Sequence, residues 1–263
     1  MNTSAIKYHS VEDMDIKNFF NVNGYVLFSD LFSEQDIVNI RTEFFDLVSF
    51  LKKKYSIKVS EINNESNAFE IFSFDPKLRK NLYELTQELR SITSLCGSQK
   101  LTSVFQKMGL EFPVLRNQAI RIDFAQEPQF LQGIHQDVRG MRSGNCLNFW
   151  IPLQTVNENN GTLSVFPKSH TLGGVVPKTT NESGYQIFKE EEISQFEKIL
   201  LEIQPGHALM FHPYLFHGSV HAKENRLRLT ITLRFDDISN MDWLLKEVPD
   251  FYQLDIQDHT RFT

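Results

Sequence analysis

The chain has 263 residues, of which 41% are hydrophobic and 23% charged, a composition typical of globular proteins rather than disordered or fibrous ones. Its 27 basic and 33 acidic side chains give a formal net charge of −6, so there is no basic surplus to neutralise nucleic-acid phosphates. No apolar run approaches the roughly 20 residues of a membrane-spanning helix, and the first residues contain no apolar stretch of signal-peptide type. We therefore expect a cytoplasmic protein that binds neither nucleic acid nor membrane.

The part of the chain up to about residue 110 is predicted to be rich in helices. Residues 11–20 form an amphipathic stretch, and residues 24–28 have the apolar character of a buried strand. Ser33 is a candidate N-cap for a longer helix that extends to about residue 54. Helical spacing returns over residues 82–108, with a break near Gly97, whereas residues 55–75 are expected to form a loop over one face.

From about residue 111 to 240 the pattern changes to short strands separated by turns. The clearest runs are 119–124, 146–153, 162–166, 207–211 and 227–235. Many short strands after a helical segment predict a mainly β fold with flanking helices, whose core is a double-stranded β-helix (a jelly roll of the cupin type). No linker rich in Pro, Gly or Ser divides the chain, so residues 1–263 are expected to form a single domain.

Three of these strands alternate polar and apolar side chains, which point to opposite faces of a strand. The polar positions are Arg121 and Asp123 in the first strand, Asn148 and Trp150 in the second, and Arg226, Arg228, Thr230, Thr232 and Arg234 in the last. A sheet with one face in water explains any one strand of this kind. A polar lumen that binds a charged ligand explains all three together, because enclosed polar groups need partners.

The tripeptide His135-Gln136-Asp137 places an imidazole and a carboxylate on the same side of an extended segment, where a single metal ion could bind both. Alone, this pattern is common in proteins without metal sites. A second histidine is available from the segment 211–221, which contains three. Two histidines and one carboxylate form a facial triad with open coordination positions, which suits non-haem Fe(II) oxygenases.

The segment from about residue 115 to 236 resembles the phytanoyl-CoA dioxygenase-like family of Fe(II)/2-oxoglutarate oxygenases. In that family, a Ser follows the second iron histidine by two positions, and the Arg that binds the 2-oxoglutarate carboxylate follows it by eleven. The candidates give Ser219 and Arg228 after His217, Tyr214 and Lys223 after His212, and Lys223 and Thr232 after His221. Only His217 meets both requirements.

Further segments support the resemblance. Residues 150–161 are similar to a family strand and turn that end in Asn-Gly, and residues 162–170 to its Pro-Gly-Ser-His element. Lys168 stands where that element has Gly, so the backbone of this turn is expected to differ. Residues 19–27 are similar to the opening of the family, whereas nothing is recognised between about 55 and 110.

The resemblance implies that His135, Asp137 and His217 bind the iron, and that Arg228 and Ser219 bind the carboxylate of 2-oxoglutarate. It places Trp150 in the wall of the 2-oxoglutarate pocket and implies a cosubstrate contact for Arg121, which could instead meet the substrate. The implied cofactors are Fe(II), 2-oxoglutarate and O₂. The expected reaction is hydroxylation of an unactivated C–H bond of a small-molecule metabolite, with release of succinate and CO₂.

The carboxylate of Asp137 argues for hydroxylation, since related halogenases lack it; desaturation and ring formation stay open. Arg139, Met141 and Arg142 are candidates for the pocket mouth, where their charge would suit an anionic or polar molecule, and residues 171–190 for a lid. His170, His207, His212 and His221 are expected to lie outside the active site, with His221 the first exception to consider because it is expected near the mouth. Two other functions remain: a jelly-roll binding protein without catalysis, and a zinc hydrolase using the same triad.

Overall fold

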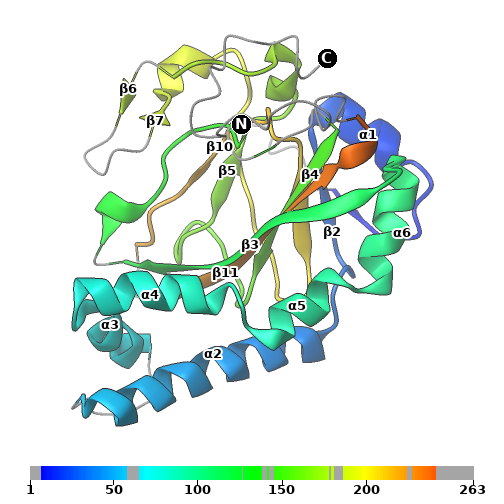
Figure 1. Cartoon of the computed structure of the whole chain (residues 1–263). Coiled ribbons are helices and arrows are strands. Elements are labelled where there is room, and N and C mark those ends of the chain that lie inside the picture. Colours follow the sequence, from blue (N-terminus) through cyan, green and yellow to red (C-terminus); the bar gives the residue numbers. More distant parts are fainter. Residues whose placement is uncertain are drawn as a thin grey trace, which may run out of the picture.

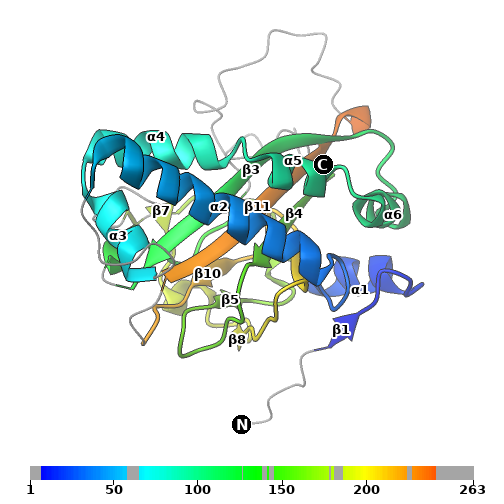
Figure 2. The same ribbon diagram turned by 90° about the horizontal axis from the view of Figure 1, so that it is seen from below.

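The computed structural model describes residues 7–57, 65–125, 127–137, 141, 145–177, 179–180, 186–223 and 227–240. The described chain forms a large sheet and a smaller one, with the helices gathered on the outer side of the large sheet (Figure 1). Seen from below, α2 runs across β3 and β11 (Figure 2). The predicted fold class, a β core of jelly-roll type with flanking helices, is confirmed.

The helices are α1 (Ile16–Asn23), α2 (Glu34–Tyr55), α3 (Glu65–Ser73), α4 (Pro76–Thr86), α5 (Arg90–Cys96) and α6 (Gln99–Met108). Ser33 caps α2 as predicted: its hydroxyl accepts from the Asp36 N–H at 3.1 Å, and the Asp36 carboxylate accepts from the Ser33 N–H at 2.9 Å. The expected loop over residues 55–75 is wrong in part, because α3 lies within it. Residues 58–64 lie outside the described part of the chain.

The large sheet has the strand order β1-β2-β9-β4-β11-β3. Its strands are β1 (Tyr8–His9), β2 (Tyr25–Phe28), β3 (Pro113–Phe124), β4 (Cys146–Pro152), β9 (Ala208–Phe211) and β11 (Leu227–Asp237). The smaller sheet has the order β10-β5-β8, with β5 (Leu163–Val165), β8 (Ile199–Leu200) and β10 (His217–Ser219). A short pair, β6 (Thr179–Thr180) and β7 (Gln186–Ile187), and the 3₁₀ helices η1 (Pro128–Phe130), η3 (Ser169–Leu172), η4 (Glu190–Ile193) and η5 (Ile238–Asn240) complete the described elements.

The two faces of the large sheet have different cores. The outer face packs its apolar residues, among them Ile122, Phe149 and Ile231, against the buried sides of the helices. On the inner face a second apolar cluster, which includes Trp150 and Phe211, fills the space toward the smaller sheet. The alternation read from the sequence therefore separates a helix-covered core from a lumen between the sheets. No helix among the described residues is long and apolar enough to cross a membrane.

Strand register sets the order of polar side chains along this lumen. In β11, Arg228 lies opposite Asp123 of β3, and Arg234 lies opposite Asn148 of β4. Thr232 lies between Trp150 on one side and Ala119 on the other. One row of inward-facing positions thus runs from Arg228 to Arg234, and the functional groups described below lie along it.

Candidate metal and cosubstrate site

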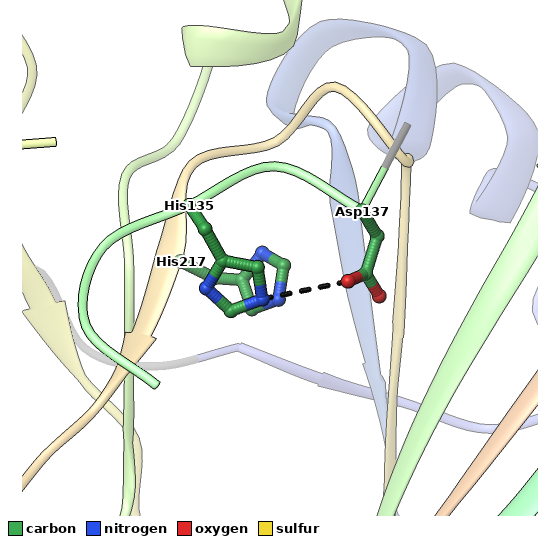
Figure 3. A group of neighbouring side chains, drawn as sticks. All are labelled: His135, Asp137 and His217. Carbon is green, nitrogen blue, oxygen red and sulfur yellow. Dashed lines mark ion pairs between the residues drawn. The ribbon is translucent and has the colours of Figure 1, made fainter. Parts of the chain in front are cut away.

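Two neighbouring segments bring together His135, Asp137 and His217. His135 and Asp137 follow η1, whereas His217 opens β10. His135 donates its backbone N–H to the His217 carbonyl at 2.8 Å, and the His217 N–H returns to the His135 carbonyl at 3.1 Å. This bridge places the two imidazoles side by side, with their centroids 4.2 Å apart, and Asp137 approaches them from one side (Figure 3).

Backbone carbonyls determine which nitrogen of each imidazole carries a proton. Nδ1 of His135 lies 2.8 Å from the Gly133 carbonyl, and Nδ1 of His217 lies 3.0 Å from the Leu215 carbonyl. A carbonyl only accepts hydrogen bonds, so each Nδ1 carries a proton and each Nε2 is the nitrogen that remains for a metal ion. Burial, reinforced by the neighbouring His135, lowers the pKa of His217 to about 3, so this imidazole is neutral near pH 7.

The Asp137 carboxylate has one oxygen held by the protein and one directed at the histidines. Oδ2 accepts from Asn148 Nδ2 at 3.1 Å and from Arg234 Nε and Nη2 at 3.2 and 3.0 Å. Oδ1 lies 3.4 Å from His135 Nε2. Burial opposes ionisation of this carboxyl, but Arg234 together with the His135 and His217 side chains outweighs it and holds the pKa well below its usual value. Oδ1 is therefore an anionic ligand atom in a fixed orientation.

This donor set fits a divalent iron ion. Ligand atoms of the three side chains lie within 4.8 Å of one another, and no other such group of His, Cys, Asp or Glu occurs in the part of the chain that the structure describes. Two imidazoles and one carboxylate on one side of the metal are the ligands of non-haem Fe(II) enzymes that keep open positions for substrates.

A second charged group, here called the clamp, consists of Arg228, Asp123 and Ser219. Arg228 lies in β11, at the opposite end of that strand from Arg234. Arg228, which is 3% exposed, donates from Nε and Nη2 to Oδ2 of Asp123 at 3.2 and 2.9 Å. Its Nη2 also donates to Ser219 Oγ at 3.1 Å, and its Nη1 to the Thr162 carbonyl at 3.0 Å. Burial raises the pKa of Asp123, but Arg228 and then Arg121 more than offset this, and the net pKa is lowered.

One pocket joins the triad to the clamp. Its walls include the three triad residues, Arg121, Gln132, Trp150, Leu163, Phe211, Ser219, Thr232 and Arg234. Ser219 stands in the wall, and Arg228 lies behind it. The pocket thus has a metal-binding end, apolar walls and an arginine-backed end, which is the layout that an iron ion and a dicarboxylate require.

The family model described as phytanoyl-CoA dioxygenase (PhyH) matches residues 20–228 of this chain. The chain belongs to the PhyH family. This confirms the resemblance read from the motifs. It also confirms the expected enzyme class, an Fe(II)- and 2-oxoglutarate-dependent dioxygenase, and the expected cofactor pair, which the donor set of the site supports independently.

Known proteins similar to this PhyH chain differ in how much they share with it. The peroxisomal phytanoyl-CoA dioxygenase of Bos taurus is 23% identical over 239 residues, covering 87% of this chain and 70% of that protein. The 1-deoxypentalenic acid 11-beta-hydroxylase of Streptomyces exfoliatus is 30% identical over 126 residues, 43% of this chain and 44% of that protein. The crystal structure of the epimerase SnoN with Fe³⁺, alpha ketoglutarate and nogalamycin RO has a TM-score of 0.59 at 13% identity, with coverage of 89% and 91%, and shows the shared fold.

The structure brings together the residues that were expected to bind iron and 2-oxoglutarate, and it adds several that were not expected. Asn148, Arg234 and Asp123 were read only as polar positions of alternating strands. Their roles depend on strand register, which pairs Arg234 with Asn148 and Arg228 with Asp123. The alternation of polar and apolar residues thus predicted which face of the sheet these side chains occupy, but it could not predict which side chains they contact.

Gln136, between the two metal-ligand candidates, was also missed. Its amide Nε2 donates to the carbonyls of Tyr214 and Gly173 at 2.6 and 2.9 Å, and its Oε1 accepts from the Val175 N–H at 2.8 Å. The Tyr214 contact connects it to the segment that leads into His217. This one side chain therefore joins both triad segments to the start of the expected lid.

Other sequence expectations have mixed outcomes. Lys168 adopts φ 66°, a left-handed conformation that Gly favours, so Lys stands here in a backbone that suits Gly. The other named histidines, His170, His207, His212 and His221, lie outside the triad cluster. Of the candidate mouth residues, Met141 is buried, whereas Arg139 and Arg142 lie outside the described residues. So do residues 178 and 181–185 of the expected lid.

Proposed function

We propose that this PhyH enzyme hydroxylates an unactivated C–H bond of a small-molecule metabolite, with release of succinate and CO₂. One observation carries the proposal. The Nε2 atoms of His135 and His217 and Oδ1 of Asp137 converge at one end of a pocket whose other end has Ser219 backed by Arg228. Metal-binding and carboxylate-binding ends in a single pocket match a reaction that consumes 2-oxoglutarate at an iron centre.

The protein's part at the metal end is to hold three ligand atoms in fixed orientations. His135 and His217 would bind iron through Nε2, because Nδ1 of each is committed to a carbonyl. Asp137 would bind through Oδ1, because Arg234 and Asn148 hold Oδ2. When bound, the iron and 2-oxoglutarate together supply the activation of O₂ that C–H hydroxylation needs.

At the clamp end, Ser219 and Arg228 would bind the far carboxylate of 2-oxoglutarate. The charged groups here are Arg121, Arg228 and Asp123, and their sum of 2 − 1 gives one net positive charge. This balances a single carboxylate. The walls between the ends include Trp150, Leu163 and Phe211, which keep water from the reacting groups once the pocket is filled.

Hydroxylation is favoured by the complete triad. Asp137 occupies the position that a halide takes in related halogenases, and its carboxylate is buried, ionised and hydrogen-bonded. The two relatives described above are named a dioxygenase and a hydroxylase. The shared fold with an epimerase makes the reaction a matter for direct measurement.

The test is an anaerobic titration of the metal-free protein with Fe(II) and 2-oxoglutarate. Bidentate binding of the oxoacid to iron gives a visible charge-transfer band, which we expect in the wild type. His135→Ala should abolish it, and Arg228→Ala should shift it to much higher 2-oxoglutarate concentration. Matched controls are His221→Ala, an exposed histidine outside the triad, and Arg90→Ala, whose side chain is 96% exposed. Both should retain the band.

Admission of air to the loaded protein should then yield succinate, and a true substrate should accelerate its formation and appear as a product with one oxygen atom from O₂. Absence of the band in a folded protein would overturn the proposal. Tight Zn(II) binding with hydrolytic activity would favour the hydrolase, and ligand binding without metal would favour the binding protein.

A further inference from the structure

A second pocket, here called the α4 pocket, adjoins the metal pocket at the free edge of the large sheet. It has a volume of about 420 Å³ and lies between α4 and β3, two elements that lie side by side (Figure 1). Arg79, Lys80 and Tyr83 of α4 form one wall, residues 119–123 of β3 the floor, and Phe130 of η1 the other wall. This volume is within the range of small-molecule sites.

Three structural links place the α4 pocket against the metal pocket. Arg121 lines both. Ala119, in the floor of the α4 pocket, is the register partner of Thr232, which lines the metal pocket. Phe130 and Gln132 belong to one short segment, and each lines one of the two pockets. The two cavities therefore adjoin along β3 and the segment that follows it, with Arg121 at their common border.

The metal pocket is already assigned to the metal ion and the dicarboxylate that its two ends match. A substrate that reacts at the metal must extend into adjoining space. The α4 pocket meets this need because it shares Arg121 with the metal pocket.

The walls of the α4 pocket suit a flat apolar molecule. The Arg79 guanidinium lies 4.9 Å from the Phe130 ring centroid, and Glu127 holds it with a hydrogen bond of 2.7 Å. The Tyr83 hydroxyl donates to the Ile122 carbonyl at 2.6 Å. Its proton is therefore used in a hydrogen bond to the edge strand β3. Two aromatic rings and a planar guanidinium thus stand in fixed positions around the cavity.

The charge of the α4 pocket favours an anion. Its lining contains Arg79, Lys80 and Arg121 against Asp123, which sums to 3 − 1, or +2. Inclusion of their ion-pair partners, the cation Arg228 and the anions Glu127 and Glu84, gives 4 − 3, or +1. In the protein without 2-oxoglutarate, the excess is positive in either count.

We propose that the α4 pocket binds the primary substrate, and that this substrate is an organic anion with a flat apolar body. Phe130, Tyr83 and Arg79 contact the body, whereas Arg121 and Lys80 attract the anionic group. That the occupant is the substrate rests on the proposed function; that the pocket binds such anions does not. Phe130 and Lys80 are thereby specificity-determining residues of this enzyme.

The first experiment uses two fluorescent probes with the same aromatic skeleton on the full chain. 8-Anilinonaphthalene-1-sulfonate carries the anion, and N-phenyl-1-naphthylamine lacks it. We expect the folded protein to bind the sulfonate with one site and more tightly than the amine. Phe130→Ala should weaken the sulfonate about two- to tenfold, and Lys80→Glu about two- to fivefold, because the Lys80 side chain is 78% exposed.

Matched controls keep the test specific. Phe112→Ala removes another exposed ring at the opposite end of β3, and Lys77→Glu reverses another exposed charge on α4. Neither residue lines the pocket, and both variants should bind the sulfonate like the wild type. Equal binding of the two probes would overturn the anion assignment. Unchanged binding in Phe130→Ala, or equal losses in the controls, would overturn the pocket assignment.

The second experiment measures proximity to the metal. Mn(II) in the triad should broaden the proton signals of the bound sulfonate, whereas diamagnetic Zn(II) should not, and Phe130→Ala should reduce the broadening. Probe binding without Mn(II)-dependent broadening, in a protein shown to bind Mn(II), would overturn the substrate-pocket assignment and leave the Fe(II)/2-oxoglutarate titration unaffected. Conversely, a missing charge-transfer band with intact probe binding would overturn the proposed function alone.

Discussion

The two ends of the lumen contain the same kind of ion pair. At the metal end, Arg234 of β11 donates from Nε and Nη2 to Oδ2 of Asp137. At the clamp end, Arg228 of β11 donates from Nε and Nη2 to Oδ2 of Asp123. The geometry is alike, but the remaining atoms differ. Asp137 keeps Oδ1 directed at His135, so the arginine prepares a carboxylate for a cation. Arg228 keeps a hydrogen bond to Ser219, so the aspartate prepares an arginine for an anion.

The two ends also differ in access to water. The Arg228 side chain is 4% exposed and its aspartate 8%, whereas the Arg234 side chain is 24% exposed and its aspartate 9%. A charge that loses its partner costs more free energy where water cannot replace that partner. The comparison thus separates an end on which folding depends from an end on which metal binding depends, and variants can test this separation.

The largest expected effect is on stability at the clamp end. Asp123→Ala leaves the buried guanidinium of Arg228 without its carboxylate, which should lower the free energy of unfolding by about 3–5 kcal/mol. Asp137→Ala should cost clearly less in the metal-free protein, because Arg234 can turn to water and to Asn117, which it already contacts at 3.2 Å. Urea unfolding in the presence of a chelator measures both; equal losses would refute the separation.

As the pH falls, the metal end should lose stability before the clamp end, because the neutral side chain of His212 supports the metal end. Nδ1 of His212 accepts from the Tyr214 N–H at 3.1 Å, and burial, with a contribution from His170, lowers the pKa of His212 to about 4. The unfolded chain takes up this proton near pH 6.5. The contribution to stability is therefore complete above about pH 6.5 and is lost as the pH falls toward 4, by up to about 3 kcal/mol.

His212→Asn tests this assignment, because the Asn amide oxygen can accept from the Tyr214 N–H but does not titrate. The metal-free variant should lose less stability than the wild type between pH 6.5 and 4. His217 titrates in both proteins and cancels in the difference. The measurement is a series of urea unfolding curves across this pH range, and parallel curves for the two proteins would show that His212 is not the group responsible.

Two Lys substitutions then separate the ends by ligand. Arg228→Lys keeps the charge but loses the planar fork, so 2-oxoglutarate affinity should fall about tenfold, while metal affinity stays within about threefold. Arg234→Lys should do the reverse, with metal affinity reduced about tenfold through the loosened Asp137. Calorimetric titration of Mn(II), and of 2-oxoglutarate into the Mn(II)-loaded protein, gives both constants. If either variant reduced both affinities equally, the metal end and the clamp end would have to be treated as one coupled site.

The sequence predicted the parts of the fold that depend on local periodicity and capping. Ser33 marks the start of α2, and the alternation over residues 227–235 identifies the lumen strand and its inward face. The helix over 65–73 was missed, and tertiary packing of residues such as Ala68 and Phe72 against the core completes it.

The site was predictable where chemistry fixes spacing within one segment. The distances from His217 to Ser219 and Arg228, and from His135 to Asp137, are of this kind. Asn148 and Asp123 were not assigned because their partners come from other strands, and a shift of register by one residue would reverse every side chain. Gln136 was missed for a similar reason, since its partners lie in two distant loops.

The smallest expected effect is at the turn before η3, which supports the metal end from behind. Lys168 has φ 66° there, and a side chain in this conformation costs about 1 kcal/mol relative to Gly. Lys168→Gly removes this cost, but Gly has greater freedom in the unfolded chain, worth about 0.5–1 kcal/mol, so the free energy of unfolding should rise by at most about 0.5 kcal/mol.

The neighbouring Ser169 hydroxyl accepts from the N–H of Phe216, next to His217, so the turn touches the metal end through one hydrogen bond. Because Lys168→Gly keeps the backbone conformation, that bond should persist and Mn(II) affinity should not change. Thermal unfolding and Mn(II) titration of the variant measure the two quantities. A gain in stability with weaker metal binding would mean that the strained turn orients His217, and would extend the metal end of the lumen to η3.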